Sequence, residues 1–230
     1  MNRISLIQNL INEREYSVYL EIGTYKGVSF LPIKCATKIA VDPKIKISLL
    51  KKLKLHFSKE KNTKNFYFEM TSDSFFQKRK KFLEKIGKLD IVLVDGLHTF
   101  EASLKDVLNS LKHLDDNGVI IMHDCFPPHQ AAATPASSGA EAKKMGVEGW
   151  TGTWCGDVWK TIVYLRKKYP DSLEAQVLNT DFGLGVINPL RKCKDLKLDI
   201  NQDLFQEVNA LEYEYLISNN GKAIGLKEVS

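Results

Sequence analysis

The stretch LDIVLVDGLHTFE, residues 89–101, decides the fold and holds the first candidate functional residues. Its unbroken apolar run, residues 91–94, is typical of a strand buried on both faces, as in a parallel sheet covered by helices. Asp95 and His98 follow this run, so both are expected at the carboxyl end of the strand. Open α/β sheets bind their ligands at that edge. The stretch therefore predicts a chemically active site as well as a strand.

Strand–helix alternation surrounds this stretch. Apolar runs bounded by turn residues predict further strands over residues 18–22, 38–41, 65–69, 119–122, 176–179 and 184–188. Helical spacing predicts helices over residues 3–14, 28–37, 45–57, 100–114 and 157–169, and another from Ser72. The helix over 45–57 places Leu49, Leu50, Leu53 and Phe57 on one face. This order predicts an α/β, Rossmann-like fold: a seven-stranded, mainly parallel sheet with helices on both faces and a terminal antiparallel hairpin.

Length and composition favour a soluble globular protein. At 230 residues, without a visible repeat or linker, the chain is expected to form a single domain over residues 1–230, with its core over about 15–190. The net charge is +5, and the lysines concentrate between Lys44 and Lys88, which indicates a solvated helical face or affinity for an anionic partner. Basic and aromatic residues are not interleaved, so nucleic acid is not an expected partner.

The cysteines and the apolar segments bear on the compartment. The cysteines are widely spaced and form no CxxC pair, so neither a zinc site nor a disulfide is expected. No apolar run is long enough to span a bilayer, and the first residues lack a signal-peptide core. We therefore expect a cytoplasmic protein without a membrane partner.

The 126–156 segment departs from the alternation. Loops of this length in compact domains are usually lids, binding loops or disordered. It ends near Trp150, Trp154 and Trp159, which flank glycines and suggest a lid over a flat or ring-shaped substrate. For Trp159, anchoring the next helix in the core is the favoured alternative. A last helix is expected over about 203–218, where Tyr213 and Tyr215 could serve a homodimer contact.

Polar turns follow the first three predicted strands. The turn EIGTYKG, residues 21–27, has glycines that let a ligand approach the backbone closely, although a turn that binds nothing is the alternative. Its spacing is not GxGxxG, which disfavours a dinucleotide. Asp42 could accept both hydroxyls of a ribose, or could be a cap or turn residue. Ser72 and Asp73 could reach an adenine amino group, or could cap a helix.

These three turns resemble those of the class I S-adenosylmethionine-dependent methyltransferases: ExGxxxG, then an acid, then a polar pair. By that likeness the glycine turn would hold the methionine part of the cofactor, Asp42 the ribose, and Ser72 with Asp73 the adenine. The resemblance implies cofactor contacts for Glu21, Gly23, Thr24, Tyr25, Gly27, Asp42, Ser72, Asp73 and Asp95.

The next two strand ends are similar to those of metal-dependent O-methyltransferases, above all the macrocin-type sugar O-methyltransferases and the cephalosporin-hydroxylase-like group. Asp95 and His98 end the fourth strand, and His123 with Asp124 ends the fifth. The likeness implies a divalent metal, Mg²⁺ first, on Asp95 and Asp124, with His98 as the base. Neighbouring strands lie about 4.8 Å apart, which lets the two aspartates converge.

His123 departs from that pattern, because the sugar enzymes carry two adjacent acids after the fifth strand. Either His123 is a third ligand, which would make Mn²⁺, Fe²⁺ or Zn²⁺ conceivable, or it points away from the metal. The leading hypothesis is therefore metal-assisted O-methylation of a sugar or another small hydroxylated acceptor. The alternatives are a nicotinamide-dependent oxidoreductase and a non-catalytic adenosyl-binding module.

Overall fold

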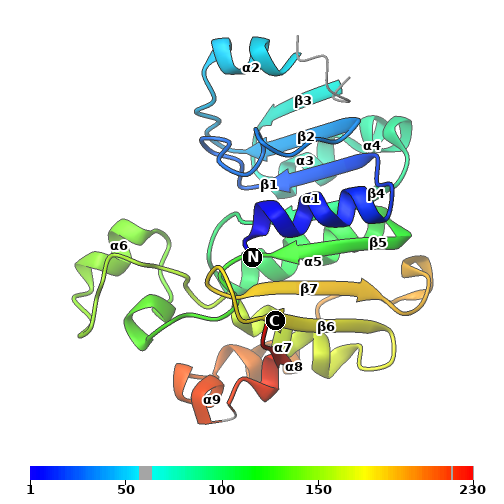
Figure 1. Ribbon diagram of the computed structural model, residues 1–230. Coiled ribbons are helices and arrows are strands. Elements are labelled where there is room, and N and C mark those ends of the chain that lie inside the picture. Colours follow the sequence, from blue (N-terminus) through cyan, green and yellow to red (C-terminus); the bar gives the residue numbers. More distant parts are fainter. Residues whose placement is uncertain (57–63, 219, 230) are drawn as a thin grey trace.

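The computed structural model describes residues 1–56, 64–218 and 220–229. Its centre is a sheet of order β3-β2-β1-β4-β5-β7-β6-β8 (Figure 1). Strands β3 to β5 of this order run parallel, whereas β7 is antiparallel to both β5 and β6. The strands are β1 (Val18–Ile22), β2 (Thr37–Asp42), β3 (Lys64–Glu69), β4 (Leu89–Val94), β5 (Leu114–Met122), β6 (Leu173–Leu178), β7 (Leu184–Pro189) and β8 (Leu226–Lys227).

The predicted fold class is confirmed, but the predicted number of strands is wrong. Within the described residues the sheet has eight strands rather than seven. The additional strand, β8, has only two residues and pairs in parallel with β6. Two residues are too few to show the alternation of apolar and polar side chains by which strands are recognised in a sequence.

Helices cover the sheet unequally (Figure 1). On one face, α3, α5 and α7 pack against a large apolar cluster that includes Leu20, Val92 and Ile120. On the other face, α1 packs against a smaller cluster together with residues from the 24–36 segment. The helices are α1 (Arg3–Glu13), α2 (Leu49–His56), α3 (Ser72–Lys78), α4 (Lys80–Ile86), α5 (Phe100–His113), α6 (Gly139–Lys144), α7 (Trp159–Lys168), α8 (Gln202–Asn209) and α9 (Tyr213–Ser218).

None of the helices in the described part of the chain has the length and apolar character needed to cross a bilayer.

The helix predicted over residues 28–37 is wrong, because the chain forms turns there before β2 begins at Thr37. Pro32 lacks the backbone N–H that a helix interior needs. The carbonyl oxygens of Phe30 and Ile33 instead accept hydrogen bonds from Nζ of Lys38, at 2.5 and 2.7 Å. Lys38 is fully buried, and burial lowers the pKa of its ammonium to about 8. A buried cation thus holds an irregular segment where a helix was expected.

Replacing Lys38 with methionine is expected to lower the free energy of unfolding by about 3 kcal/mol, because two buried carbonyl groups lose their donor. Urea unfolding followed by circular dichroism measures this change. The matched control is Lys81→Met on the exposed side of α4, which should change stability by less than about 0.5 kcal/mol. Equal midpoints for the two variants would contradict a supporting role for Lys38.

Helix α2 also differs from the expectation. It begins at Leu49, and Leu49, Leu50 and Leu53 are 71%, 80% and 43% exposed, so they do not form a buried face. Ile47 and Leu55 contribute to the core instead. Phe57 lies outside the described residues.

Two other expected helices are each divided, into α3 and α4 at Arg79 and into α8 and α9 after Asn209.

Candidate active site

The ends of β4 and β5 bring the predicted acids together. The register pairs Val94 with Met122, so Asp95 and His123 each lie one residue beyond a strand end. The backbone N–H of His123 still donates to the carbonyl of Val94, at 3.1 Å. Asp124 then adopts a left-handed conformation, with φ of +61°, which is uncommon for a residue other than glycine. This turn directs the Asp124 carboxylate back toward the end of β4.

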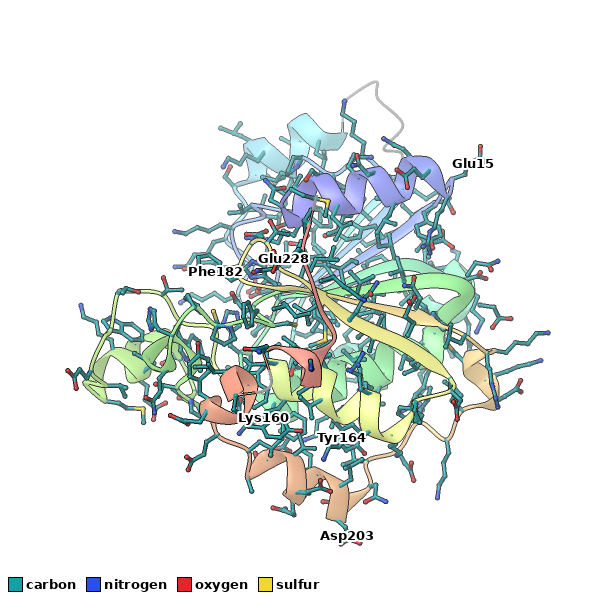
Figure 2. All side chains as sticks on the ribbon, turned by 60° about the horizontal axis from the view of Figure 1, so that its bottom comes forward. Glu15, Lys160, Tyr164, Phe182, Asp203 and Glu228 are labelled. Carbon is teal, nitrogen blue, oxygen red and sulfur yellow. The ribbon has the colours of Figure 1, made fainter. Side chains whose placement is uncertain are left out.

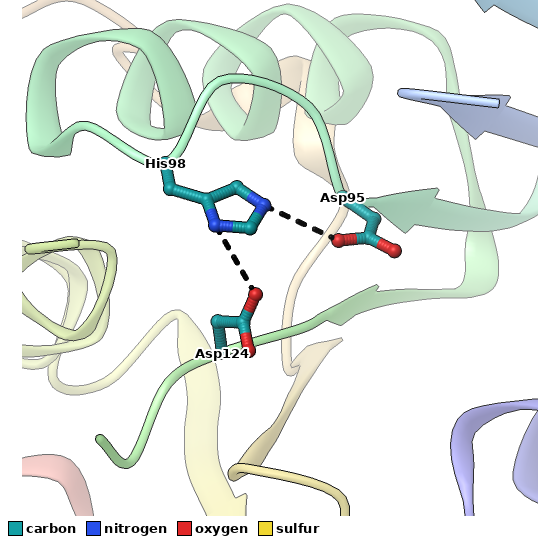
Figure 3. A group of neighbouring side chains, drawn as sticks. All are labelled: Asp95, His98 and Asp124. Atoms are coloured by element: carbon teal, nitrogen blue, oxygen red, sulfur yellow. Dashed lines mark ion pairs between the residues drawn. The ribbon is translucent and has the colours of Figure 1, made fainter. Parts of the chain in front are cut away.

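Asp95, His98 and Asp124 form a compact group of potential ligands (Figure 3). Nε2 of His98 lies 3.6 Å from Oδ1 of Asp95, and Nδ1 of His98 lies 3.3 Å from Oδ2 of Asp124. One ligand atom from each residue lies within 4.8 Å of the others. Two carboxylates and an imidazole at this spacing suit a divalent cation, with Mg²⁺ favouring the oxygens and Mn²⁺ or Zn²⁺ tolerating the nitrogen.

The orientation of the His98 ring identifies its basic nitrogen. Nδ1 lies 3.2 Å from the carbonyl oxygen of Trp154, which can only accept a hydrogen bond. A proton on Nδ1 therefore satisfies both this carbonyl and Asp124, and Nε2 is left as the acceptor in the neutral ring. The indole of Trp154 stacks on the imidazole, with ring centroids 4.9 Å apart, and fixes the ring plane. His98 is thus held as a base with one defined proton-accepting atom.

His123 lies beside the same two aspartates but contacts them differently. Its Nδ1 is 3.1 Å from Oδ2 of Asp124 and 3.4 Å from Oδ1 of Asp95. Its Nε2 is 2.9 Å from Nη1 of Arg3 and 3.4 Å from Oδ1 of Asp181. Both ring nitrogens therefore already have protein partners. A ligand role for His123 stays a prediction, and His98 takes its place in the group of three described above.

The carboxylates and imidazoles shift one another's proton affinities. Burial alone would raise the pKa of Asp95, but hydrogen bonds from His123 and His98 hold it well below its usual range. Burial disfavours charged imidazoles, yet hydrogen bonds to Asp124, Asp181 and Asp95 raise the pKa of His123 to about 11. The pKa of His98 is also raised, because contacts with Asp95 and Asp124 outweigh burial. Asp95 is thus ionised and available to hold a cation.

A cavity of about 820 Å³ opens beside this group, along the carboxyl ends of β1, β2 and β4. Its volume lies within the range of about 300–1,000 Å³ that is typical of small-molecule sites. Six of the residues expected to contact a cofactor line it. They are Gly23, Tyr25, Asp42, Ser72, Asp73 and Asp95.

Three other expected contacts lie behind the cavity wall. Glu21 is buried, accepts a hydrogen bond from the hydroxyl of Tyr19, and has its pKa raised to about 8 by burial. Thr24 donates its hydroxyl to the carbonyl of Glu21, at 3.2 Å, and Gly27 packs against Ile47. In this structure these residues shape the glycine turn, and their role toward a cofactor stays a prediction.

Gly23 explains why the turn needs glycine at that position. Its φ is +91°, and a Cβ built there would lie 1.8 Å from the backbone oxygen of Asp95. The backbone segments that follow β1 and β4 can therefore approach this closely only if residue 23 has no side chain. This contact ties the wall of the cavity directly to the residue that carries the first carboxylate of the metal-binding group.

Asp42 is organised for hydrogen bonding by the turns around it. Its Oδ2 accepts from the backbone N–H of Tyr25, at 2.8 Å, and its Oδ1 accepts from the N–H of Lys44, at 2.6 Å. Each carboxylate oxygen keeps a further lone pair for a ligand. The structure also decides whether Ser72 and Asp73 cap α3. Thr71 is the N-cap of α3, and the side chains of Ser72 and Asp73 lie in the first turn.

Asp106 is a cavity residue that sequence reasoning missed. It lies on α5, is only 4% exposed, and lines the cavity. Burial raises its pKa to about 7, against a hydrogen bond to Ser72 that lowers it. The signal was present, because Asp106 shares a helix face with Ser103 and Ser110, which are also buried. A carboxyl group on the buried face of a helix points to a ligand or a buried partner.

The 126–156 segment forms part of the cavity wall. Ser137, Ser138 and Trp154 line the cavity, and the indole N–H of Trp154 donates to the carbonyl of Thr134 at 2.9 Å. Trp159 is buried in the core, as the alternative interpretation predicted. Asp157 accepts a hydrogen bond from the N–H of Phe100, at 2.7 Å, and so satisfies the first N–H of α5, whose N-cap is Thr99.

Comparisons with known proteins agree with this geometry. Residues 20–125 match the model of a family described as a methyltransferase domain. These residues of the chain are thus similar to a methyltransferase domain. The matched residues include the end of β1, all of β2 and β4, and the polar residues that follow these strands. A search of curated proteins finds no match to the chain.

Solved structures share the fold of this chain at low identity. The SAH-bound methyltransferase PaMTH1 of Podospora anserina is 17% identical with a TM-score of 0.54, over 82% of this chain and 78% of that one. TomG of Streptomyces achromogenes, an O-methyltransferase in complex with SAM, is 10% identical with a TM-score of 0.55, over 81% and 79%. An O-methyltransferase of Bacillus cereus in complex with SAH is 15% identical with a TM-score of 0.53, over 80% and 78%.

The prediction of a methyltransferase agrees with the family match, and the predicted fold agrees with the solved structures. The family match also favours this hypothesis over a nicotinamide-dependent oxidoreductase. The narrower likeness to metal-dependent sugar enzymes stays a prediction.

Proposed function

We propose that the protein transfers a methyl group from S-adenosylmethionine to a hydroxyl of a small acceptor, with a divalent cation bound by Asp95 and Asp124 and with His98 as the base. The observation that carries this proposal is the position of Asp95, which both lines the 820 Å³ cavity and belongs to the group formed with His98 and Asp124. A methyl donor in the cavity and an acceptor over the ligands would therefore meet at one residue.

The residues lining the cavity would divide the cofactor between them. Asp42 would accept the ribose hydroxyls through lone pairs that the backbone leaves unused. Ser72 and Asp73 would lie toward the adenine, with Asp106 beneath them. Gly23 would allow the cofactor to approach the backbone of the first turn.

The acceptor side would supply the proton chemistry. The cofactor provides a methyl group on a sulfonium, and a bound cation lowers the pKa of the acceptor hydroxyl. Nε2 of His98 would accept the hydroxyl proton, while Asp124 and the Trp154 carbonyl hold the proton on Nδ1. Asp95, 3.6 Å from Nε2, would then stabilise the imidazolium. Positioning of the oxygen in line with the methyl group supplies much of the rate.

The acceptor would lie against the turn between β6 and β7. Phe182 in this turn is 45% exposed (Figure 2), and its ring stands edge-on to His123 with centroids 6.3 Å apart. An exposed aromatic ring beside His123 suits the CH face of a sugar or a phenolic ring. A sugar hydroxyl is preferred on the resemblance noted in the sequence.

We also propose a single-domain, cytoplasmic enzyme, and a homodimer as its assembly. Tyr213 and Tyr215 on α9 are the proposed dimer contacts, and Tyr213 also donates its hydroxyl to the carbonyl of Pro127, at 3.0 Å. Light scattering coupled to gel filtration tests the assembly.

Calorimetric titration of S-adenosylmethionine, with and without Mg²⁺, tests the proposal. The native chain is expected to bind the cofactor, and Asp42→Asn should bind it about 10–100-fold more weakly, because the amide presents a donor where two hydroxyl donors must be accepted. The matched control is Glu69→Gln, at the exposed end of the next strand, which should bind like the native chain. No cofactor binding by the native chain would refute the proposed function.

A further inference from the structure

Arg3, at the first position of α1, reaches into the proposed catalytic centre from the start of the chain. Its side chain contacts residues from separate segments that are as many as 178 positions away in the sequence. Nε donates to Oγ of Ser29 at 2.9 Å and lies 3.7 Å from Oδ2 of Asp95. Nη1 lies 2.9 Å from Nε2 of His123 and 3.1 Å from Oδ2 of Asp181.

The backbone holds this arginine in place independently of its side chain. Asn2 caps α1 through a capping box with Ser5, so the helix begins at Arg3. The backbone N–H of Arg3 donates to Oδ2 of Asp181, at 2.8 Å. Thr180 donates its hydroxyl to the carbonyl of Met1. The first turn of α1 and the turn between β6 and β7 are thus fastened together over the centre.

The contact with His123 determines where that ring carries its proton. A guanidinium can only donate, so the 2.9 Å contact makes Nε2 of His123 the acceptor in the neutral ring and leaves the proton on Nδ1. In the charged ring Nε2 also carries a proton and faces the guanidinium, so the contact with Arg3 opposes the charged ring. In both states Nδ1–H faces Oδ2 of Asp124 and Oδ1 of Asp95, at 3.1 and 3.4 Å.

The charges of the group agree with this arrangement. Asp95, Asp124 and Asp181 carry three negative charges, and Arg3 carries one positive charge. The carboxylates and the guanidinium together leave two negative charges, which one divalent cation would offset. Because Nη1 of Arg3 pairs with Asp181, the uncompensated charge falls mainly on Asp95 and Asp124, the two carboxylates closest to His98.

We propose that Arg3 is a positioning residue of the catalytic centre: by holding Nε2 of His123 and Asp181, it makes His123 a hydrogen-bond donor that orients Asp95 and Asp124 toward a divalent cation. This inference rests on the proposed function. It also assigns His123 to the outer partners of the cation rather than to its ligands. Such outer partners typically change metal affinity about 10–100-fold when they are replaced.

Binding of Mn²⁺, followed by electron paramagnetic resonance, tests the role of Arg3 without relying on turnover. Arg3→Gln removes the charge and the fork of donors, and is expected to weaken Mn²⁺ binding about tenfold or more. Arg3→Lys keeps the charge but not the fork, and is expected to recover only part of the affinity. Calorimetric affinity for S-adenosylmethionine should stay within about twofold of the native value in both variants.

Two further variants separate positioning from folding. Asp181→Asn weakens the ion pair that holds Arg3, so this variant should also bind Mn²⁺ more weakly. The double variant with Arg3→Gln should bind Mn²⁺ about as weakly as Arg3→Gln alone. Arg14→Gln, at the exposed far end of α1, is the matched control and should leave both affinities unchanged. If Arg3→Gln fails to fold, Arg3→Lys and Asp181→Asn carry the same test.

The outcomes that overturn the inference are distinct from failure of the proposed function. Native protein that binds S-adenosylmethionine but no Mn²⁺ refutes the metal part of the proposed function, and the role of Arg3 with it. Native protein that binds Mn²⁺, with unchanged Mn²⁺ affinity in Arg3→Gln and Asp181→Asn, refutes only the role of Arg3. Parallel losses of Mn²⁺ affinity, cofactor affinity and melting temperature would reduce Arg3 to a structural residue.

Discussion

Replacing His98 with glutamine is expected to lower kcat about 10²–10⁴-fold, the usual contribution of a general base. Glutamine can still donate to the Trp154 carbonyl or to Asp124, but it has no atom that accepts a proton at neutral pH. S-adenosylmethionine affinity should stay within about twofold, because His98 does not line the cofactor cavity. Methyl transfer to a panel of sugars and phenols, followed by release of S-adenosylhomocysteine, measures kcat.

The control for His98 is a histidine with a similar environment elsewhere. His113→Gln removes a half-buried imidazole that stacks on Phe76 at the end of α5, and it should leave kcat unchanged. If His98→Gln retained native kcat on an accepted substrate, the base would have to be another group.

The pH dependence follows from the same residue. His98 acts as a base only when neutral, and contacts with Asp95 and Asp124 raise its pKa above the ordinary value near 6.5. The rate should therefore rise with pH through this raised pKa and fall as the pH drops below it. A cation bound among the carboxylates destabilises the charged form of His98 and so lowers its pKa. Added Mg²⁺ should therefore shift the rising part of the pH–rate profile toward lower pH.

Gly156→Ala is expected to have the second large effect, because Gly156 packs directly on His98. A Cβ at this position would lie 1.8 Å from the carbonyl oxygen of His98, and the residue has φ of +64°. The backbone on one or both sides must move, so the base is displaced from the cofactor cavity. Misplacement by about 1 Å costs about 10²-fold in rate, and we expect a loss of at least that size.

Gly152→Ala is a matched control from the same segment. Gly152 also has a positive φ, +91°, but a Cβ there meets nothing within 4 Å. Both variants incur the conformational cost of about 1–2 kcal/mol, and only Gly156→Ala adds the collision. Comparable kcat values for the two variants would contradict the importance of the contact with His98.

Much of the sheet could be predicted from the sequence, because its strands are buried and marked by turn residues. The first strand was expected over residues 18–22 and lies there, and the helix expected over 100–114 is α5, Phe100–His113. The failures have physical causes. Helical spacing over 28–37 was overridden by Pro32 and by the buried ammonium of Lys38, whose partners only the tertiary structure reveals.

The candidate site divides in the same way. Asp95, His98 and Asp124 could be placed together because β4 and β5 are neighbours and each residue follows a strand end. Arg3 and Asp181 could not, because one begins a helix and the other lies in a short turn, and no periodicity links them. Asp106 could have been found, since a carboxyl group on the buried face of α5 conflicts with its surroundings.

In the turn between β6 and β7, the side chain at position 182 would affect both the stability of the protein and the binding of the acceptor. Phe182 is held in a left-handed conformation, with φ of +60°, which costs a residue other than glycine about 1 kcal/mol. Its carbonyl accepts from the N–H of Phe126 at 2.8 Å, a contact that any side chain at position 182 would leave in place. Glycine or asparagine there would relieve the strain and remove the aromatic face. Substitution of Phe182 would therefore change the acceptor preference and leave the sheet intact. Variants without the aromatic ring would be more stable and would bind the proposed acceptor more weakly.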